Sequence, residues 1–188
     1  MRRIYLIKHA APQMQPTVSS DRWSLSLAGR AAALVMAERL AGVEFAAIVS
    51  SSEPKAIETA GILSEQLNIP AEAVVGLHEH ERRHVPVMRT PEYISQMAQV
   101  FKRPDEWVLG EETAGDALDR FRDAYDGVLK KYPMGDLAMV SHGTVIALFL
   151  ASISEQDGFQ LWRQMGLPSY AIIEEPGSNV GEIVLAMK

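Results

Sequence analysis

The chain of 188 residues contains no cysteine, and this absence excludes several kinds of chemistry. Without thiols the protein has no disulfides, no thiolate metal site and no cysteine nucleophile. The absence fits a reducing compartment, and we expect a cytoplasmic protein. Any catalysis must rest on other side chains.

Positive charge is scarce as well, because 18 Lys and Arg stand against 24 Asp and Glu, for a formal net charge of −6. A general nucleic-acid binder needs a surplus of Lys and Arg, so nucleic acid is not an expected partner. No apolar stretch is long enough to cross a membrane, and the run after Arg2-Arg3 is too short for a signal peptide. An anion site in this chain must therefore be a local cationic pocket.

Short apolar runs alternate with helical patterns, which is typical of an α/β protein, and the length fits a single domain over residues 1–188. Buried strands are predicted at residues 4–7, 46–49, 73–77 and 136–140. Helices are predicted near residues 27–42, 54–67, 90–101, 113–132, 144–148 and 155–165. Two last strands, at 170–174 and 182–187, are expected to form a hairpin, so the predicted sheet is mostly parallel but mixed.

The first helix has apolar residues at positions i, i+4, i+7 and i+8. These are Leu27, Ala31, Leu34 and Val35. Their spacing predicts that this face packs against the sheet.

Two of the five histidines come two positions after the last residue of an apolar run, His9 after residues 4–7 and His142 after residues 136–140. One such histidine is commonly structural. If both strands are parallel neighbours, however, their carboxyl ends meet at one edge of the sheet, where α/β proteins bind ligands. The imidazoles are then expected to face each other, with Lys8 beside them. This arrangement predicts a site for an anion and a nucleophile.

A cluster of polar residues follows the third apolar run, at His78, Glu79, His80 and Glu81. Histidine and carboxylate are good metal ligands, so the cluster could form a metal site. A solvated charge run is the commoner outcome for such a segment. Arg82 and Arg83, together with His80, could select an acidic substrate, but an exposed basic pair is more often solvated.

The ordered set of motifs resembles the histidine phosphatase superfamily, the phosphoglycerate-mutase-like phosphatases. The matching segments are Lys8-His9-Ala10, Ser50-Ser51, Lys55-Ala56 with Thr59-Ala60, Leu77-His78-Glu79, Gly110-Glu111 and Ser141-His142-Gly143. The family has Arg where this chain has Lys8 and Lys55, and Gly where it has Ala10. The resemblance runs from Ile4 to about Leu148 and implies a three-layer α/β/α sandwich.

The resemblance also implies phosphoryl transfer without a metal or other cofactor. His9 would be the nucleophile, and Glu79 the acid that protonates the leaving alcohol, with Glu81 as the alternative acid. Lys8, Lys55 and His142 would bind the phosphate, and His142 would share in catalysis. The expected substrate is a phosphorylated small molecule or a phosphoprotein.

The two lysines leave two interpretations open. Lysine keeps the charge of arginine but loses the planar fork that holds two phosphate oxygens, so weakened phosphatase activity is one expectation. The other is a non-catalytic module that binds a phosphorylated ligand. Retention of His9, Glu79 and His142 together favours the enzyme. No feature of the sequence indicates an oligomeric state.

Overall fold

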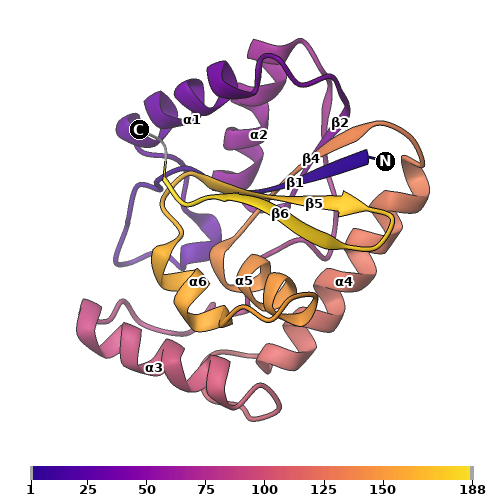
Figure 1. Ribbon diagram of the computed structural model, residues 1–188. Helices are drawn as coiled ribbons and strands as arrows, with labels where there is room; N and C mark the ends of the chain where they lie inside the picture. Colours follow the sequence, from indigo (N-terminus) through magenta and orange to yellow (C-terminus); the bar gives the residue numbers. More distant parts are fainter. Residues whose placement is uncertain (1, 187–188) are drawn as a thin grey trace.

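The computed structural model describes residues 2–186 and has an α/β fold with one six-stranded sheet in that range (Figure 1). Its strands are β1 (Arg2–Lys8), β2 (Phe45–Ser50), β3 (Ala71–Ala73), β4 (Asp136–Ser141), β5 (Ser169–Glu175) and β6 (Asn179–Val184). The order across the sheet is β3-β2-β4-β1-β5-β6. The first four of these are parallel, and β5 and β6 are antiparallel to their neighbours. The predicted mixed sheet is therefore confirmed.

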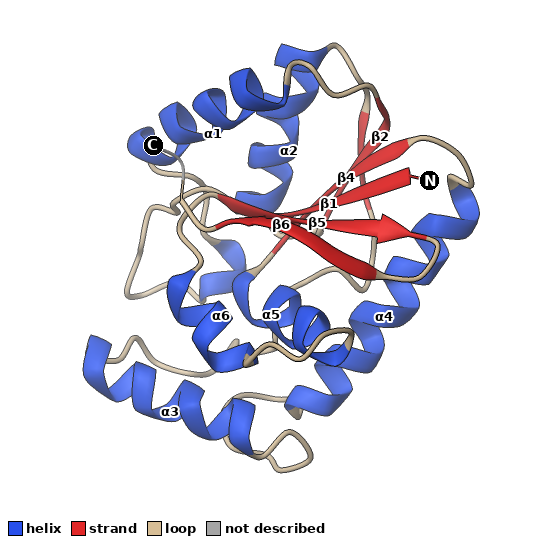
Figure 2. Cartoon of the chain, in the orientation of Figure 1, coloured by secondary structure: helices blue, strands red, loops and turns tan. Residues whose placement is uncertain are grey.

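Helices cover both faces of the sheet, which gives the three layers (Figures 1 and 2). They are α1 (Leu27–Leu40), α2 (Pro54–Leu67), α3 (Thr90–Lys102), α4 (Ala114–Lys131), α5 (Gly143–Ser152) and α6 (Gly158–Gln164), with a short 3₁₀ helix η1 (Ser20–Arg22). Helices α1 and α2 lie on one face, and α4, α5 and α6 on the other. None of the helices within residues 2–186 combines the length and the apolar character that crossing a membrane requires.

Strand β1 is buried on both faces, as its unbroken apolar sequence predicts. Ile4 and Leu6 pack into the core beneath α4 and α5, and Tyr5 and Ile7 into the core beneath α1 and α2. The four side chains are 0–3% exposed. Strand β1 thus holds the residues after it in a fixed position at the edge of the sheet.

Strands β1 and β4 are parallel neighbours, with Lys8 opposite Ser141. The next residues, His9 and His142, therefore leave the sheet side by side, as the sequence predicts. The backbone N–H of His9 donates to the Ser141 oxygen at 2.9 Å, which extends the pairing by one residue.

The prediction of which face of α1 is buried is wrong. Leu27 is 87% exposed and Leu34 42%, whereas the buried residues are Gly29, Ala33, Met36, Ala37 and Leu40. Apolar side chains surround this helix, so their spacing does not define one face. The buried face of α1 is determined instead by the close approach of Gly29 to Ala11, because a Cβ at Gly29 would collide with the backbone oxygen of Ala11.

The strand predicted at residues 73–77 is also misplaced. Strand β3 ends at Ala73, and Val75 is 84% exposed. Gly76 has φ +97°, a left-handed conformation that glycine adopts without steric cost. The chain turns there, and the turn directs the segment with Glu79 back toward the end of β4.

The predicted terminal hairpin is confirmed, although β6 spans Asn179–Val184 rather than residues 182–187. Met187 lies outside the described residues. Helix α6 begins at Gly158, later than predicted, because the Asp157 side chain caps it by accepting from the Gln160 N–H.

Candidate active site

His9 is a buried imidazole with a defined tautomer. Its Nδ1 lies 2.7 Å from the Ala10 oxygen, and since a carbonyl oxygen can only accept, Nδ1 carries the hydrogen. The lone pair is then on Nε2. Burial, together with Lys55 and Lys8, lowers the pKa of His9 to about 3. The ring is therefore neutral near pH 7, which is the state a nucleophile requires.

His142 lies beside His9, with 5.0 Å between the ring centroids. It precedes the first turn of α5, and its Nε2 is 2.8 Å from the Ser51 Oγ. Burial and the nearby Lys55 hold its pKa well below the ordinary value. The side chain is fully buried and does not line the main cavity of the site. Its predicted contact with phosphate therefore stays a prediction.

Lys8, the last residue of β1, provides the first cation. Its Nζ donates to the Met165 oxygen at 2.9 Å. Its stem lies against the start of α5, where a Cβ at Gly143 would be 3.0 Å from the Lys8 Cε. Burial lowers the pKa of this lysine, an effect that Glu79 partly offsets. The ammonium therefore lies in a narrow space between two backbone segments.

Lys55, in the first turn of α2, provides the second cation. Its Nζ donates to the Ser20 oxygen at 2.7 Å and forms a buried ion pair with the Glu53 carboxylate. The lysine is only 5% exposed. It is thus part of the site, and not a solvated residue in a helix terminus.

Glu53 is a buried carboxylate that the sequence analysis missed. One oxygen pairs with Lys55, while the other accepts the Glu79 backbone N–H at 2.9 Å and lies 3.6 Å from the His142 Nε2. Burial raises the pKa of Glu53, although Lys55 counteracts the effect. In the sequence Glu53 stands out only because it lies two residues before Lys55. That position alone does not predict a carboxylate within a cationic pocket.

Glu79 lines the cavity that also contains Lys8, His9 and Lys55. Its oxygens accept the N–H of His80 at 2.8 Å and of Thr144 at 3.2 Å, and one lies 3.3 Å from the Arg82 guanidinium. Burial alone would raise the pKa of Glu79, but Arg82 and the two N–H donors together lower it. The carboxylate is therefore ionised near pH 7.

Glu81, the alternative acid, does not line this cavity. Its carboxylate lies 2.8 Å from Arg83 and 3.3 Å from His78, in a smaller pocket next to the site. Of the two candidate acids, the geometry favours Glu79.

Arg82 and Arg83 have different environments, a difference that the sequence did not predict. The Arg82 side chain is 9% exposed and lies over the Tyr93 ring, 5.7 Å from its centroid, whereas the Arg83 side chain is 55% exposed. Arg82 is therefore a third cation of the site, held against Glu79. Only Arg83 fits the solvated alternative.

The segment that carries Glu79 is fixed by two long-range contacts. Arg120 of α4 donates to the backbone oxygens of His78 and Glu79 at 2.9 and 3.2 Å. Glu111, from the Gly-Glu motif, accepts the backbone N–H of His84 at 3.0 Å. The acid is thus held in place although its segment has no regular secondary structure.

The four polar residues after β3 do not converge on one point. His80 Nε2 bonds to the Glu112 backbone oxygen at 2.9 Å, while Glu79 and Glu81 have the separate partners described above. Within residues 2–186 no group of three or more histidine, aspartate and glutamate side chains is arranged to hold a metal ion.

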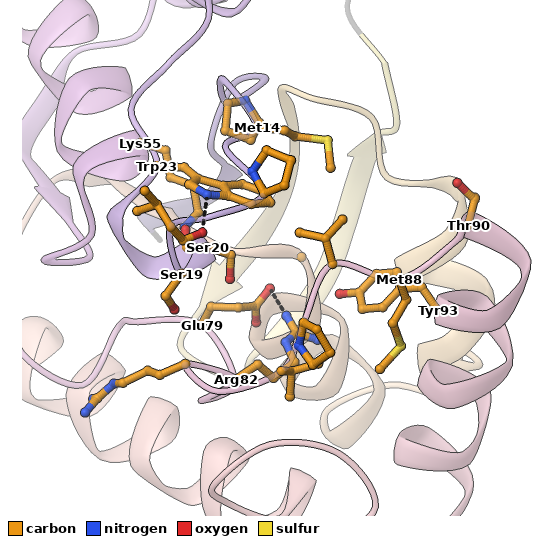
Figure 3. A pocket seen from close by; sticks show the side chains of 18 of the residues that line it. Met14, Ser19, Ser20, Trp23, Lys55, Glu79, Arg82, Met88, Thr90 and Tyr93 are labelled. Atoms are coloured by element: carbon orange, nitrogen blue, oxygen red, sulfur yellow. Dashed lines mark hydrogen bonds and ion pairs between the residues drawn. The ribbon is translucent and has the colours of Figure 1, made fainter.

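The site opens into a cavity of about 690 Å³. Figure 3 shows Lys55 and Glu79 on facing sides, with the Glu79 carboxylate directed toward Arg82 and the side chains of Trp23, Met14 and Met88 around the space. The protein therefore has an α/β fold in which a neutral imidazole, several cations and a carboxylate lie together at the carboxyl ends of parallel strands.

Comparison with known families identifies the class. The family model for the histidine phosphatase superfamily (branch 1) matches residues 4–179, and the chain belongs to this superfamily. No curated protein sequence matches the chain.

Several solved structures share the fold. A phosphoserine phosphatase from Entamoeba histolytica, in complex with 3-phosphoglyceric acid, is 15% identical with a TM-score of 0.80, over 99% of this chain and 98% of the other. A mycobacterial glucosyl-3-phosphoglycerate phosphatase is 20% identical with a TM-score of 0.76, over 98% and 99%. YhfR from Bacillus stearothermophilus is 23% identical with a TM-score of 0.75, over 98% and 96%.

Proposed function

We propose that this protein hydrolyses a phosphate monoester through a phosphohistidine at His9. One observation carries the proposal: the His9 Nδ1 bonds to the Ala10 oxygen, so a neutral Nε2 is available in the cavity that Lys8, Lys55 and Glu79 also line. An unprotonated ring nitrogen beside cations is what in-line attack on an anionic phosphorus requires.

In the proposed first step, Nε2 of His9 forms a bond to phosphorus while the bond from phosphorus to the ester oxygen breaks. The Ala10 oxygen continues to accept from Nδ1 and stabilises the positive charge that develops on the ring. Lys8 and Lys55 neutralise the phosphoryl oxygens, and charge-assisted bonds of this kind are the strong ones. We keep His142 as a second phosphate-binding and catalytic residue because its ring lies against that of His9.

Glu79 supplies the proton that the leaving alkoxide needs. Arg82 and the N–H donors favour the ionised carboxylate, but a bound phosphate dianion is a like charge and raises the pKa of a neighbouring carboxyl. Once protonated, Glu79 gives its proton to the ester oxygen. In the second step the carboxylate takes a proton from water as the water oxygen attacks phosphorus, which releases inorganic phosphate and restores neutral His9.

The surroundings of Lys8 and Lys55 support weakened activity. Each ammonium already has a protein partner, the Met165 oxygen for Lys8 and Glu53 for Lys55. Phosphate has to compete with these partners, and a lysine cannot hold two phosphate oxygens as an arginine fork does.

The function is tested by hydrolysis of an activated aryl phosphate with a metal chelator present, since the proposed chemistry uses protein groups alone. We expect turnover in the chelator and none in His9→Ala. Activity that the chelator abolishes and a divalent metal restores would contradict the proposal.

The Lys55–Glu53 ion pair also supports a second candidate function. A cation that already has a carboxylate partner stabilises the charge of the transition state less well, which would leave a module that binds a phosphorylated ligand without cleaving it. Saturable binding of phosphate esters, with no turnover and no phosphoenzyme, would favour this alternative.

A further inference from the structure

The cavity extends well beyond the groups that would hold a phosphate. Its volume of about 690 Å³ lies in the range that accommodates drug-sized molecules, and a phosphate fills only a small part of it. The charged groups Lys8, Lys55, Glu79 and Arg82 lie together at one end. The rest of the volume is available to the alcohol part of the ester.

The wall of that remaining volume is largely apolar. It includes Met14, Trp23, Val87, Met88, Ile94 and Trp162. Met14 is 56% and Val87 46% exposed, so this apolar surface is in contact with water. Its burial by a ligand would be favourable.

Two indoles of the wall are held in fixed positions. Trp23 Nε1 donates to the Val18 oxygen at 2.9 Å, which leaves its ring faces for apolar contact. Trp162 packs against the Tyr93 and Phe159 rings, with centroids 5.7 and 5.9 Å away. The surface is therefore formed before a ligand arrives, and little entropy is lost in ordering it.

Two of the arginines around this volume already have a carboxylate partner. Arg82 is paired with Glu79, and Arg83 with Glu81. Among the described lining residues beyond the phosphate end, Arg163 is an arginine without a carboxylate partner, and it lies over the Phe159 ring, 5.9 Å from its centroid. A carboxylate on the leaving group would also lie near Glu79.

We infer that the substrate is a phosphomonoester of an alcohol with a large apolar group, aromatic or long-chain aliphatic, and not an amino-acid or sugar-acid phosphate. This inference rests on the proposed function. The phosphate binds at Lys8 and Lys55, and the apolar group lies along Met14, Trp23 and Met88.

A series of linear alkyl phosphates from butyl to decyl tests the inference, each used below its critical micelle concentration. Their leaving groups have nearly the same basicity, so differences in kcat/KM report contact with the cavity. We expect kcat/KM to rise roughly threefold to fourfold per added methylene until the cavity is filled. Naphthyl phosphate should likewise exceed phenyl phosphate, while phosphoserine and 3-phosphoglycerate should fall below butyl phosphate.

Three variants locate the effect. Met14→Gln and Met88→Gln should lower kcat/KM for decyl phosphate several times more than for butyl phosphate. Met134→Gln makes the same change at a methionine that is 79% exposed and does not line the cavity, and it should match the parent.

The outcomes separate this inference from the proposed function. Turnover that depends on His9 but is independent of chain length, or is fastest with phosphoserine or 3-phosphoglycerate, overturns the apolar substrate and leaves the phosphatase intact. If no ester is hydrolysed, the proposed function fails, and calorimetry with non-hydrolysable alkyl phosphonates decides the binding question. Affinity that rises with chain length supports the apolar site, and equal affinities overturn it.

Discussion

Replacing Glu53 by glutamine should strengthen anion binding at the site. Glu53 is in direct contact with Lys55, so an anion oxygen on that ammonium lies at most two contact lengths, roughly 6 Å, from the carboxylate. Two unit charges at that distance repel by about 3 kcal/mol at an effective dielectric constant of about 20. Glutamine removes this repulsion and still offers an oxygen to the Glu79 N–H.

The assay is calorimetric titration with sulfate, a tetrahedral anion that keeps both charges from neutral to mildly acidic pH. At neutral pH we expect Glu53→Gln to bind sulfate about tenfold to a hundredfold more tightly than the parent, since about 1.4 kcal/mol is a factor of ten. Glu65→Gln removes the same charge from the exposed face of α2 and is the control, at constant ionic strength.

The pH dependence of sulfate binding provides a second test. Because burial raises the pKa of Glu53, protonation begins above the range of an ordinary glutamate, and each proton removes the repelling charge. Sulfate affinity of the parent should therefore rise as the pH falls, and that of Glu53→Gln should rise less, because only the contribution of Glu79 remains. Equal affinities at neutral pH, or the same pH profile in both proteins, would refute the reasoning.

Further predictions concern the acid, the lysines and the buried nucleophile. Glu79→Gln should slow alkyl ester hydrolysis by about 10² to 10⁴ and aryl ester hydrolysis less, because aryl leaving groups need less protonation; equal losses in kinetic assays would exclude this role. Lys8→Gln and Lys55→Gln should each weaken phosphate binding by about 1.5 to 3 kcal/mol in calorimetry, with Lys102→Gln, on the exposed end of α3, as the control; unchanged binding would remove the lysine from the site. The pKa of about 3 for His9 lies below the unfolded value of about 6.5, so acid favours the unfolded chain between these values. His9→Gln should reduce the loss of unfolding free energy there by up to about 1.4 kcal/mol per pH unit in denaturant titrations, and an unchanged slope would contradict the buried neutral ring.

The paired histidines were predictable from sequence because buried parallel strands have a distinctive pattern. Unbroken apolar runs marked β1 and β4, and the two residues after each run had to lie at the carboxyl edge of the sheet. The parallel register of the two strands placed His9 and His142 together, as predicted. Local pattern was sufficient because burial on both faces left few alternatives.

Other features depend on contacts between distant segments, which local pattern does not encode. The buried face of α1 is set by the approach of Gly29 to Ala11, and Arg82 becomes part of the site because Tyr93 and Glu79 enclose it. Glu53 places a negative charge in a pocket expected to bind an anion, so an anion site alone would favour a neutral residue there. Its role became visible only when the structure placed it between Lys55 and the Glu79 backbone.

Trapping the phosphoenzyme tests the central claim most directly. The protein is mixed with a ³²P-labelled aryl phosphate and quenched in alkali, which preserves phosphohistidine and hydrolyses acyl phosphates, and the labelled peptide is then sequenced. We expect the label on His9 in the parent and none in His9→Ala. Turnover without label on any histidine, or label that persists in His9→Ala, would contradict nucleophilic attack by His9.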